Sequence, residues 1–373
     1  MALDPTILPT DWPQGSYAGR VQTAAGPIAV AWRDGACFDM TPAFGTVSAW
    51  LNQADPIAAI TARGVPLELP AGAGLLAPVD LQAIKAAGVT YVRSMLERVI
   101  EERCRGDASQ AEAVRAEVRA IIGDDLSAVK PGSPQAMRIK AALVEKGWWS
   151  QYLEVGIGAD AEIFTKCQPM AAVGPGAAVG VHPSSQWSNP EPEAVMVVNA
   201  AGRIIGATLG NDVNLRDIEG RSALLLGRAK DNNASCALGP LVRLFDASYG
   251  LDDVRRSITT MAITGTDGFV LEETGAVGAI SRDPEDLVAQ LVSPHHQYPD
   301  GAVLFLGTPF SPAKDRGAPG LGFTHKPGDV VRISTPKLGA LQNTVLPTDQ
   351  CPPWRFGTGA LFASLAARGL PNG

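Results

Sequence analysis

The sequence feature that most constrains the fold is a pair of apolar segments joined by a short turn. Residues 194–198 (Ala-Val-Met-Val-Val) are typical of a buried strand, and residues 203–209 are typical of a returning strand. Between them, residues 199–202 (Asn-Ala-Ala-Gly) favour a turn. We therefore predict a β-hairpin in which Val198 pairs with Arg203.

Acidic residues lie at the open end of this predicted hairpin. Glu191 and Glu193 are two residues apart, so they project from the same face of an extended chain. In the predicted register Asp212 falls on that face as well and lies diagonal to Glu191. The backbones of the two residues are then within roughly 7–8 Å of each other. Three like charges this close repel one another unless a cation lies between them. Oxygen ligands without His or Cys suit Mg²⁺, with Mn²⁺ or Ca²⁺ as substitutes.

A plainer interpretation of Glu-Pro-Glu stays open at this point. Proline is common at sheet edges, so the motif taken alone is typical of a solvated strand edge. The matching position of Asp212, together with a family resemblance described below, favours the metal site instead. We therefore predict that Glu191, Glu193 and Asp212 are metal ligands.

Composition narrows the class of protein. The chain has 373 residues, 46% of them hydrophobic, which is enough for a large core, and its 40 Gly and 29 Pro indicate a β-rich fold with many turns. Its net charge of −7 and the lack of a basic block argue against a nucleic-acid partner. The five scattered cysteines, without a C-x-x-C motif, predict free thiols in a reducing cytoplasm. No leader pattern and no apolar run of ~18 residues is present, so no membrane association is expected.

The chain divides into two expected domains. Residues 1–75 are expected to form a small N-terminal β domain, and residues 76–373 a larger catalytic domain. Helices are predicted from residue 94 to 104 and over 111–122, 134–145 and 356–367, with a short one at 46–53. Strands are predicted at 17–21, 28–32, 36–40, 152–157, 162–166, 257–264, 303–307, 330–334 and 339–345. The Gly/Pro-rich loop at 306–322 is long enough to suggest a binding loop.

Several segments together resemble the fumarylacetoacetate hydrolase family, over about residues 78–345. The resemblance implies an α+β, β-rich fold, in which a mixed β-sandwich roll with peripheral helices follows the small N-terminal domain. It also implies Mg²⁺ on Glu191, Glu193 and Asp212, with Lys230 near the metal and a small anionic 2-keto acid as the substrate. The resemblance further implies a homodimer or homotetramer. The segments that carry the likeness are residues 162–166, 174–176, 191–193, 210–217, 229–230, 239–240, 307–309 and 326–329.

One position departs from the hydrolytic members of that family. These carry an N-Y-x-x-H-x-x-E segment whose His and Glu activate water. Here the corresponding segment is residues 90–97, in which Ser94 replaces the His and Glu97 keeps its place. Other segments, such as residues 216–226 and 230–237, resemble the family's 2-keto-3-deoxy-pentonate dehydratases. The resemblance thus implies a hydro-lyase, with 2-keto-3-deoxy-D-xylonate as the expected substrate and 2-oxoglutarate semialdehyde as the product.

Each candidate site residue has an expected role in such a reaction. Glu97 is the candidate acid/base, and Ser94 would orient it or bind substrate. Lys230 would balance the substrate carboxylate or the developing enolate, and Thr308 and Pro309 would shape the pocket wall. Two alternatives stay open: a 2,4-diketo-3-deoxy sugar-acid hydrolase that uses Glu97 alone, and a non-catalytic sensor that binds 2-keto acids.

Overall fold

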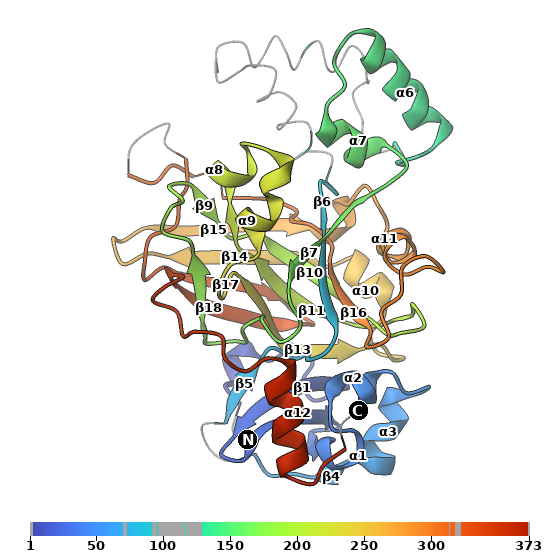
Figure 1. The fold of residues 1–373 in the computed structure, drawn as a ribbon, viewed down its shortest axis with the longest axis vertical. Helices are drawn as coiled ribbons and strands as arrows, with labels where there is room; N and C mark the ends of the chain where they lie inside the picture. The colour runs from blue at the N-terminus through green and yellow to red at the C-terminus, as the bar shows by residue number, and fades with distance from the viewer. Residues whose placement is uncertain are drawn as a thin grey trace.

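The structure is a computed structural model that describes residues 3–69, 73–91, 95, 116, 129–312, 314–317 and 322–371. Within this part of the chain the strands form three sheets. The largest runs in the order β4-β3-β2-β1-β13-β11-β10-β16-β6-β7, with β5 paired to β1. A second sheet has the order β15-β14-β17-β18-β8, and β12 pairs with β9 alone. The sheets are open, and with the helices around them they confirm the predicted α+β, β-rich class (Figure 1).

The strands of the largest sheet have the following bounds: β1 Tyr17–Thr23, β2 Gly26–Arg33, β3 Ala36–Asp39, β4 Val65–Pro66, β5 Gly74–Leu76, β6 Ala83–Gly88, β7 Glu162–Cys167, β10 Pro192–Val198, β11 Ile204–Asp212, β13 Cys236–Leu244 and β16 Ala302–Phe305. The remaining strands are β8 Ala178–Val181, β9 Ser188–Asn189, β12 Asn214–Leu215, β14 Ile258–Thr264, β15 Val270–Ala276, β17 Val330–Thr335 and β18 Gly339–Pro347.

The helices lie around the sheets and at the two ends of the molecule (Figure 1). The α-helices are α1 Thr41–Phe44, α2 Val47–Leu51, α3 Pro56–Arg63, α6 Pro134–Glu145, α7 Gln151–Ile157, α8 Arg216–Glu219, α9 Leu226–Lys230, α10 Leu251–Arg255, α11 Pro284–Leu291 and α12 Thr358–Ala367. The short 3₁₀ helices are η1 Pro5–Ile7, η4 Ala223–Leu225 and η5 Val277–Ala279. None of the helices in these ranges is long and apolar enough to cross a bilayer.

Strand β10 lies at the centre of the fold because it is buried on both faces. All seven of its residues are buried. Met196 and Val198 belong to the core shared with the β14–β17–β18 sheet. Val195 and Val197 face the opposite way, into the core shared with the helices α1–α3. Alternating side chains of one strand thus hold two cores together, which places the acidic end of the strand deep in the protein.

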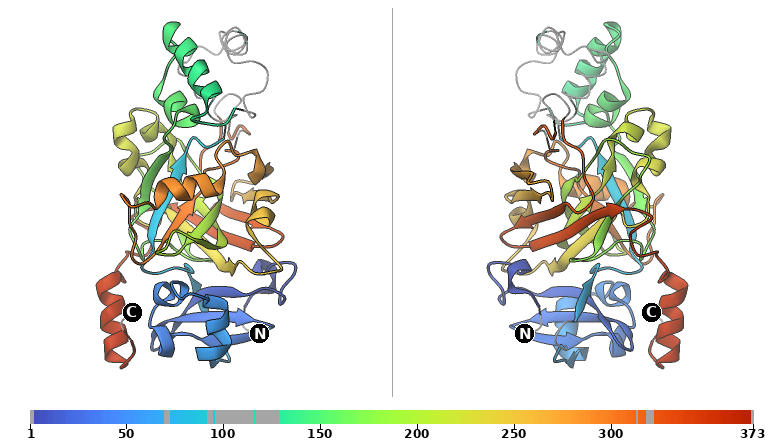
Figure 2. Two further views of the ribbon diagram at one scale, coloured as in Figure 1. Left: turned by 90° about the vertical axis from the view of Figure 1, so that its right-hand side faces the viewer. Right: turned by 90° about the vertical axis from the view of Figure 1, so that its left-hand side faces the viewer.

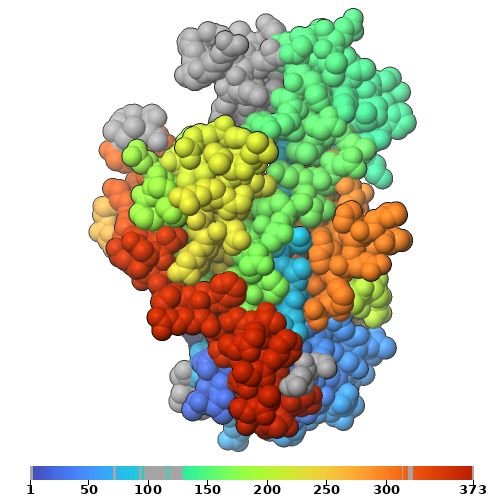
Figure 3. Space-filling model, in the orientation of Figure 1, coloured from blue at the N-terminus to red at the C-terminus, as the bar shows by residue number. Residues whose placement is uncertain are grey.

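The N-terminal strands continue the central sheet. β1 pairs with β13 of the larger unit through Tyr17–Arg243 and Ala18–Val242. The terminal helix α12 lies beside this N-terminal unit (Figure 2), and the C-terminal segment covers part of its face (Figure 3). Arg368 donates to the Pro27 carbonyl at 3.0 Å and fastens the end of the chain there. The division at residue 75 remains a prediction.

The hairpin is present, but its register differs from the predicted one. Val198 lies opposite Ile204, and a bulge between Val197 and Val198 shifts the following pairs, so that Glu193 faces Gly210. The prediction from Val198–Arg203 pairing was therefore wrong by two positions along most of the strand. An even shift leaves each side chain on the predicted face, because side chains alternate with a period of two. It also brings Asp212 directly across from Glu191 instead of diagonal to it, with the Asp212 amide donating to the Glu191 carbonyl at 3.0 Å.

A second prediction fails at residues 152–157, which form most of helix α7 instead of a strand. The side chain of Ser150 accepts a hydrogen bond from the Leu153 amide and caps the helix. Leu153 and Ile157, four residues apart, are buried on one face, which a helical period explains. The predicted helix at 134–145 is confirmed as α6, and the terminal helix is confirmed as α12, beginning at Thr358. The helices predicted at 94–104 and 111–122 lie outside the described residues, apart from Met95 and Ala116.

The cysteines agree with the prediction of free thiols where the structure describes them. Cys37, Cys167, Cys236 and Cys351 are all free. Burial raises the pKa of the Cys236 thiol well above its ordinary value, and a hydrogen bond with Cys167 contributes. Cys104 lies outside the described residues.

Candidate metal centre and substrate cavity

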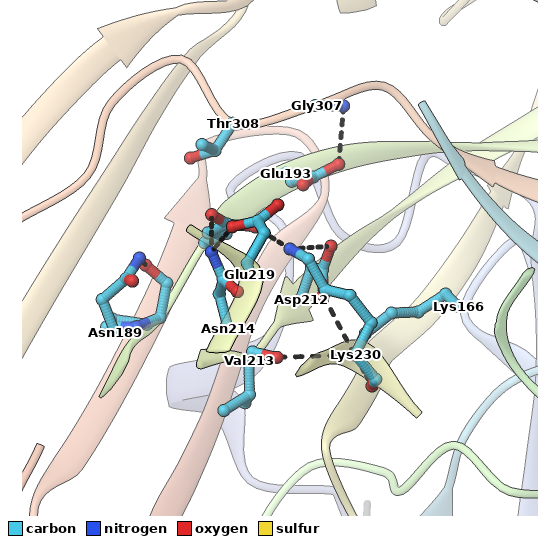
Figure 4. Close-up of polar contacts among 12 residues, drawn as sticks. Lys166, Asn189, Glu193, Asp212, Val213, Asn214, Glu219, Lys230, Gly307 and Thr308 are labelled. Carbon is cyan, nitrogen blue, oxygen red and sulfur yellow. Dashed lines mark hydrogen bonds and ion pairs between the residues drawn. The ribbon is translucent and has the colours of Figure 1, made fainter. Parts of the chain in front are cut away.

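Three carboxylates converge at the open end of the β10–β11 hairpin. Glu191 and Glu193 continue the row of side chains that Val195 and Val197 begin, and Asp212 ends the neighbouring strand. One oxygen from each of Glu191, Glu193 and Asp212 lies within 4.8 Å of the other two, and all three residues are buried. Figure 4 labels Glu193 and Asp212 of this group together with polar residues around them.

This donor set fits a hard divalent ion. Every candidate ligand is a carboxylate oxygen, which suits Mg²⁺ better than a soft metal. Opposite ligands of an octahedral Mg²⁺ lie about 4.2 Å apart, since each bond is about 2.1 Å long. The three oxygens, all within 4.8 Å of one another, are thus close enough together to ligate one ion. Three buried carboxylates beside two lysine ammonium groups also leave a negative charge that a further cation would compensate.

Two lysines approach Asp212 from different elements. Lys230, the last residue of α9, places its ammonium 2.6 Å from Glu191 Oε2 and 2.9 Å from Asp212 Oδ2. Lys166 of β7 places its ammonium 3.0 Å from Asp212 Oδ1. Both lysines are buried. The two ammonium groups therefore compensate part of the charge of the three carboxylates.

Neutral donors fix the two glutamates. The amide of Gly307 donates to Glu193 Oε2 at 2.6 Å, and Asn214 Nδ2 donates to Glu191 Oε1 at 3.0 Å. The same Asn214 nitrogen lies 2.6 Å from Glu219 Oε2. Gly307 has a φ of 93°, and a Cβ there would meet Thr90 Oγ1 at 2.0 Å, so the loop needs glycine at this position. The carboxylates are thus oriented before any ligand arrives.

The pKa values of the two glutamates and of Lys230 are all shifted from their ordinary values. Burial raises the pKa of Glu193 well above its ordinary value, and repulsion from Asp212 and Glu191 adds to it. Burial also raises the pKa of Glu191, with Lys230 acting in the opposite direction and Asp212 reinforcing the shift. Burial alone would lower the pKa of Lys230, but the Asp212 and Glu191 carboxylates outweigh it and hold that pKa well above the ordinary value. Carboxylates with raised pKa values beside a cavity are typical of functional sites.

A cavity of about 560 Å³ opens onto the group. The three carboxylates and Lys230 line it, and so do Thr308 and Pro309, which the sequence placed in the pocket wall. Thr308 Oγ1 donates to the Phe310 carbonyl at 2.6 Å, which closes a tight turn at the rim. The volume falls within the range of small-molecule sites. Ser94 and Glu97 lie outside the described residues, so their roles remain predictions.

Sequence reasoning gave no role to three groups that contact the carboxylates. They are the Lys166 ammonium, the Asn214 side-chain amide and the Gly307 main-chain amide. All three fall inside segments that carry the family resemblance. That resemblance was the one sequence feature that could have indicated a role for them. A lysine is exposed by default, so its burial against Asp212 could not be inferred from residue type.

The family description "Fumarylacetoacetate (FAA) hydrolase C-terminal" matches residues 159–346, half of the chain. The chain belongs to the fumarylacetoacetate hydrolase family. The match includes the three carboxylates, both lysines and the loop at 307–309, and it confirms the resemblance drawn from the sequence.

Two curated relatives are similar to this chain over about half of its length. A "2-dehydro-3-deoxy-D-arabinonate dehydratase" of Saccharolobus solfataricus is 32% identical over 183 residues, covering 48% of this chain and 57% of that protein. A "Probable 2-keto-3-deoxyxylonate dehydratase" of Haloferax volcanii is 32% identical over 184 residues, covering 49% and 60%. The matches thus span less than two thirds of either relative.

Solved structures show the same fold over most of the chain. A "2-keto-3-deoxy-D-arabinonate dehydratase complexed with magnesium and 2,5-dioxopentanoate" has a TM-score of 0.60 and 20% identity, covering 89% of this chain and 99% of that one. A fumarylacetoacetate hydrolase from Exiguobacterium antarcticum has a TM-score of 0.58 and 16% identity, covering 89% and 99%. At these identities the likeness shows the fold alone.

Proposed function

We propose that this protein is a Mg²⁺-dependent hydro-lyase that dehydrates a 2-keto-3-deoxy-pentonate to 2-oxoglutarate semialdehyde, which is 2,5-dioxopentanoate. The observation that carries the proposal is the buried trio of Glu191, Glu193 and Asp212, with Lys230, at the wall of one cavity. The names of both curated relatives, and the ligands named with one structural neighbour, support the same reaction.

The two sugar names among the relatives describe one compound in the D series. D-Xylonate and D-arabinonate differ only in configuration at C2 and C3. In the 2-keto-3-deoxy acid, C2 is a planar carbonyl and C3 a methylene, so C4 is the one stereocentre left. We therefore propose 2-keto-3-deoxy-D-xylonate, identical to 2-keto-3-deoxy-D-arabinonate, as the substrate. The remaining question of stereochemistry is D against L at C4.

The reaction removes one proton and one hydroxide and then moves a double bond. A divalent ion on the trio would act as a Lewis acid toward the keto group and acidify the neighbouring C3 protons. Loss of a C3 proton and of the protonated C4 hydroxyl gives a C3–C4 double bond and one water. A proton then leaves C5 and another joins C3, which produces an enol between C4 and C5. Protonation at C4 and loss of the enol O–H proton then give the aldehyde. The semialdehyde therefore forms without an external oxidant or reductant.

The chain's own residues divide this work. Lys230 lines the cavity with an ammonium whose pKa is held high, so it is a fixed positive charge for the substrate carboxylate or the enolate oxygen. Glu97 is proposed as the acid/base and Ser94 as its partner or as a substrate hydrogen-bond donor. Thr308 and Pro309 would form the wall beside the substrate carbon chain.

Assembly and location complete the proposal. We expect a homodimer or homotetramer in the cytoplasm, supported by the family resemblance. Light scattering of the purified protein would measure the mass, and a monomer at working concentrations would contradict the oligomer.

The direct test is a product assay. Purified protein with Mg²⁺ and D-2-keto-3-deoxy-pentonate should yield a semialdehyde that an added 2-oxoglutarate-semialdehyde dehydrogenase oxidises, with NADH formation as the readout. Pyruvate and a second acid from 2,4-diketo-3-deoxy sugar acids would instead support the hydrolase. Binding without turnover of any acid in the panel would support the sensor.

The role of Glu97 has its own test. Glu97→Gln should abolish turnover while Mg²⁺ affinity, measured by calorimetry, stays within about twofold of the wild type, because the amide cannot take up a proton. Glu101→Gln, four residues further along the same predicted helix, is the matched control and should keep full activity. Full activity of Glu97→Gln would exclude it as the acid/base.

A further inference from the structure

Lys166 is a buried lysine for which the proposed reaction has no use. It lies on β7, its relative exposure is 0%, and it is not among the described residues that line the cavity. Placing an ammonium in the interior is costly unless several acceptors surround it. The acceptors that Lys166 finds should therefore indicate its purpose.

Those acceptors belong to the two elements that carry the metal ligand and the substrate lysine. The Lys166 ammonium contacts Asp212 Oδ1 at 3.0 Å, and it donates to the main-chain carbonyl of Lys230. It also approaches Ser235 Oγ at 3.4 Å and the Val213 carbonyl at 3.5 Å. One ammonium thus joins the end of β11, the end of α9 and the residues that follow each of them.

The carbonyl of Lys230 is the decisive contact. Lys230 is the last residue of α9, where the main-chain carbonyls have no partner within the helix. Lys166 and the Ser235 hydroxyl, at 2.6 Å, both donate to that carbonyl. With its main chain fixed, the Lys230 side chain crosses to Asp212 Oδ2 and Glu191 Oε2 on the cavity side. Asp212 therefore has one lysine on each oxygen, and one of these lysines anchors the other.

We propose that Lys166 is a positioning residue that holds the end of α9 against Asp212 and so aims the Lys230 ammonium into the cavity. This inference rests on the proposed function in one respect, namely that Lys230 acts on the substrate. Lys166 is not among the described residues that line the cavity, so it would act on the substrate only through Lys230. If Lys166 served only to neutralise Asp212, its loss would leave the placement of Lys230 unchanged.

Chemical labelling of Lys230 tests this placement without any activity. The protein is treated with formaldehyde and cyanoborohydride in EDTA, and methylation of each lysine is followed by mass spectrometry. In the wild type Lys230 should react slowly, because its ammonium is buried and paired with two carboxylates. In Lys166→Met, whose side chain is of similar length, Lys230 should react at least tenfold faster relative to Lys326, whose side chain is 47% exposed.

Lys85→Met is the matched control. Lys85 lies on β6 opposite Thr165, the residue next to Lys166, and donates to the Thr165 hydroxyl at 2.8 Å. The same substitution there should leave labelling of Lys230 unchanged. An unchanged Lys230 rate in folded Lys166→Met would overturn the inference, whatever reaction the protein catalyses.

Ser235→Ala covers the case in which Lys166→Met does not fold. It removes the second donor to the Lys230 carbonyl, and we expect a rise in Lys230 labelling of about threefold; no rise would overturn the inference. Where turnover is established, a double-mutant cycle adds a kinetic readout. Lys166→Met should lower kcat at least tenfold in the wild-type background and less than twofold in a Lys230→Met background. Equal losses in both backgrounds would contradict action through Lys230.

Discussion

Two ionic groups in this protein contain buried carboxylates, but the pKa values of those carboxylates are shifted in opposite directions. At the first, the carboxylates of Glu191 and Glu193 have pKa values raised by burial. At the second, Arg316 lies between Asp329 and Asp267, with nitrogen–oxygen distances of 2.7 to 3.2 Å to the two carboxylates. There burial would raise the pKa of Asp329, but hydrogen bonds from His325 and Arg316 outweigh it and lower the pKa to about 2.

The difference between the two groups suggests how a functional cluster of charges can be told from a structural one, namely by whether each carboxylate has a matched cationic partner. At the Arg316 group each carboxylate has a planar partner that matches both of its oxygens, so the ionised form is favoured. At the hairpin, three carboxylates share two lysines and face a cavity. A cluster that is short of cations and open to a cavity can accept another cation, whereas a matched pair cannot.

The loop at 306–322 connects the two groups. Near its start the Gly307 amide holds Glu193, and further along Arg316 is held by Asp329 and Asp267. Thr308 and Pro309 lie between these anchors and line the cavity. We therefore interpret the Arg316 group as the fixed support of the loop that forms one wall of the site.

The largest expected effect follows from removing a charge at the first group. Glu193→Gln should abolish measurable Mg²⁺ binding by calorimetry and lower turnover by about 10³-fold or more, equivalent to about 4 kcal/mol. Stability in EDTA should not fall, because a buried carboxylate with a raised pKa disfavours folding at neutral pH. A large loss of stability in EDTA would show that the trio is structural like the second group.

The same amide substitution at the second group should have the opposite result. Asp329→Asn removes the buried one of the two carboxylates that pair with Arg316 and leaves only the more exposed Asp267, which should cost about 3 kcal/mol in the free energy of unfolding, measured with urea. Mg²⁺ affinity of the folded variant should stay within about threefold of the wild type. Lys326→Gln, which removes an exposed partner of Asp267, is the control and should cost below about 1 kcal/mol.

The pH dependence sharpens this contrast. The pKa of Asp329 is about 2 in the fold against an ordinary 3.8, so its stabilising contribution is complete above pH 3.8 and is lost as the pH falls toward 2. The stability of the wild type should therefore fall over this window. In Asp329→Asn that part of the acid dependence should be absent. An identical acid profile in both proteins would contradict the assignment.

The sequence was most informative where local pattern decides structure. The apolar runs flanking residues 199–202 predicted the hairpin, and the spacing of Glu191 and Glu193 predicted their shared face. The register of the hairpin could not be predicted. It depends on a bulge between Val197 and Val198, and neither residue type indicates a bulge. The predicted face of the acidic side chains was still correct, because the register differed by two residues and side chains alternate with a period of two.

The sequence failed at one local cap and at the contacts between distant residues. Residues 152–157 have the composition of a strand, yet the Ser150 cap makes them helical. Lys166 meets Lys230 across 64 positions of chain, and no spacing rule predicts that contact. The Arg316 group likewise joins residues 49 positions apart, from Asp267 to Arg316. The chemistry of the ligands was therefore predictable, whereas the residues that hold them in place were not.

The smallest expected effect tests the wall between the two groups. Thr308 Oγ1 donates to the Phe310 carbonyl, and Thr308→Val removes that bond while keeping the size of the side chain. A net loss of about 1 kcal/mol in holding the turn should raise KM for the keto acid about fivefold and leave kcat within twofold. Thr324→Val, which removes a 3.2 Å bond to the Gln186 carbonyl beyond the cavity lining, is the matched control and should leave KM unchanged. A fall in kcat at constant KM would instead place the Thr308 hydroxyl in the chemical step. Equal changes in both variants would show that the effect does not come from the turn at Thr308.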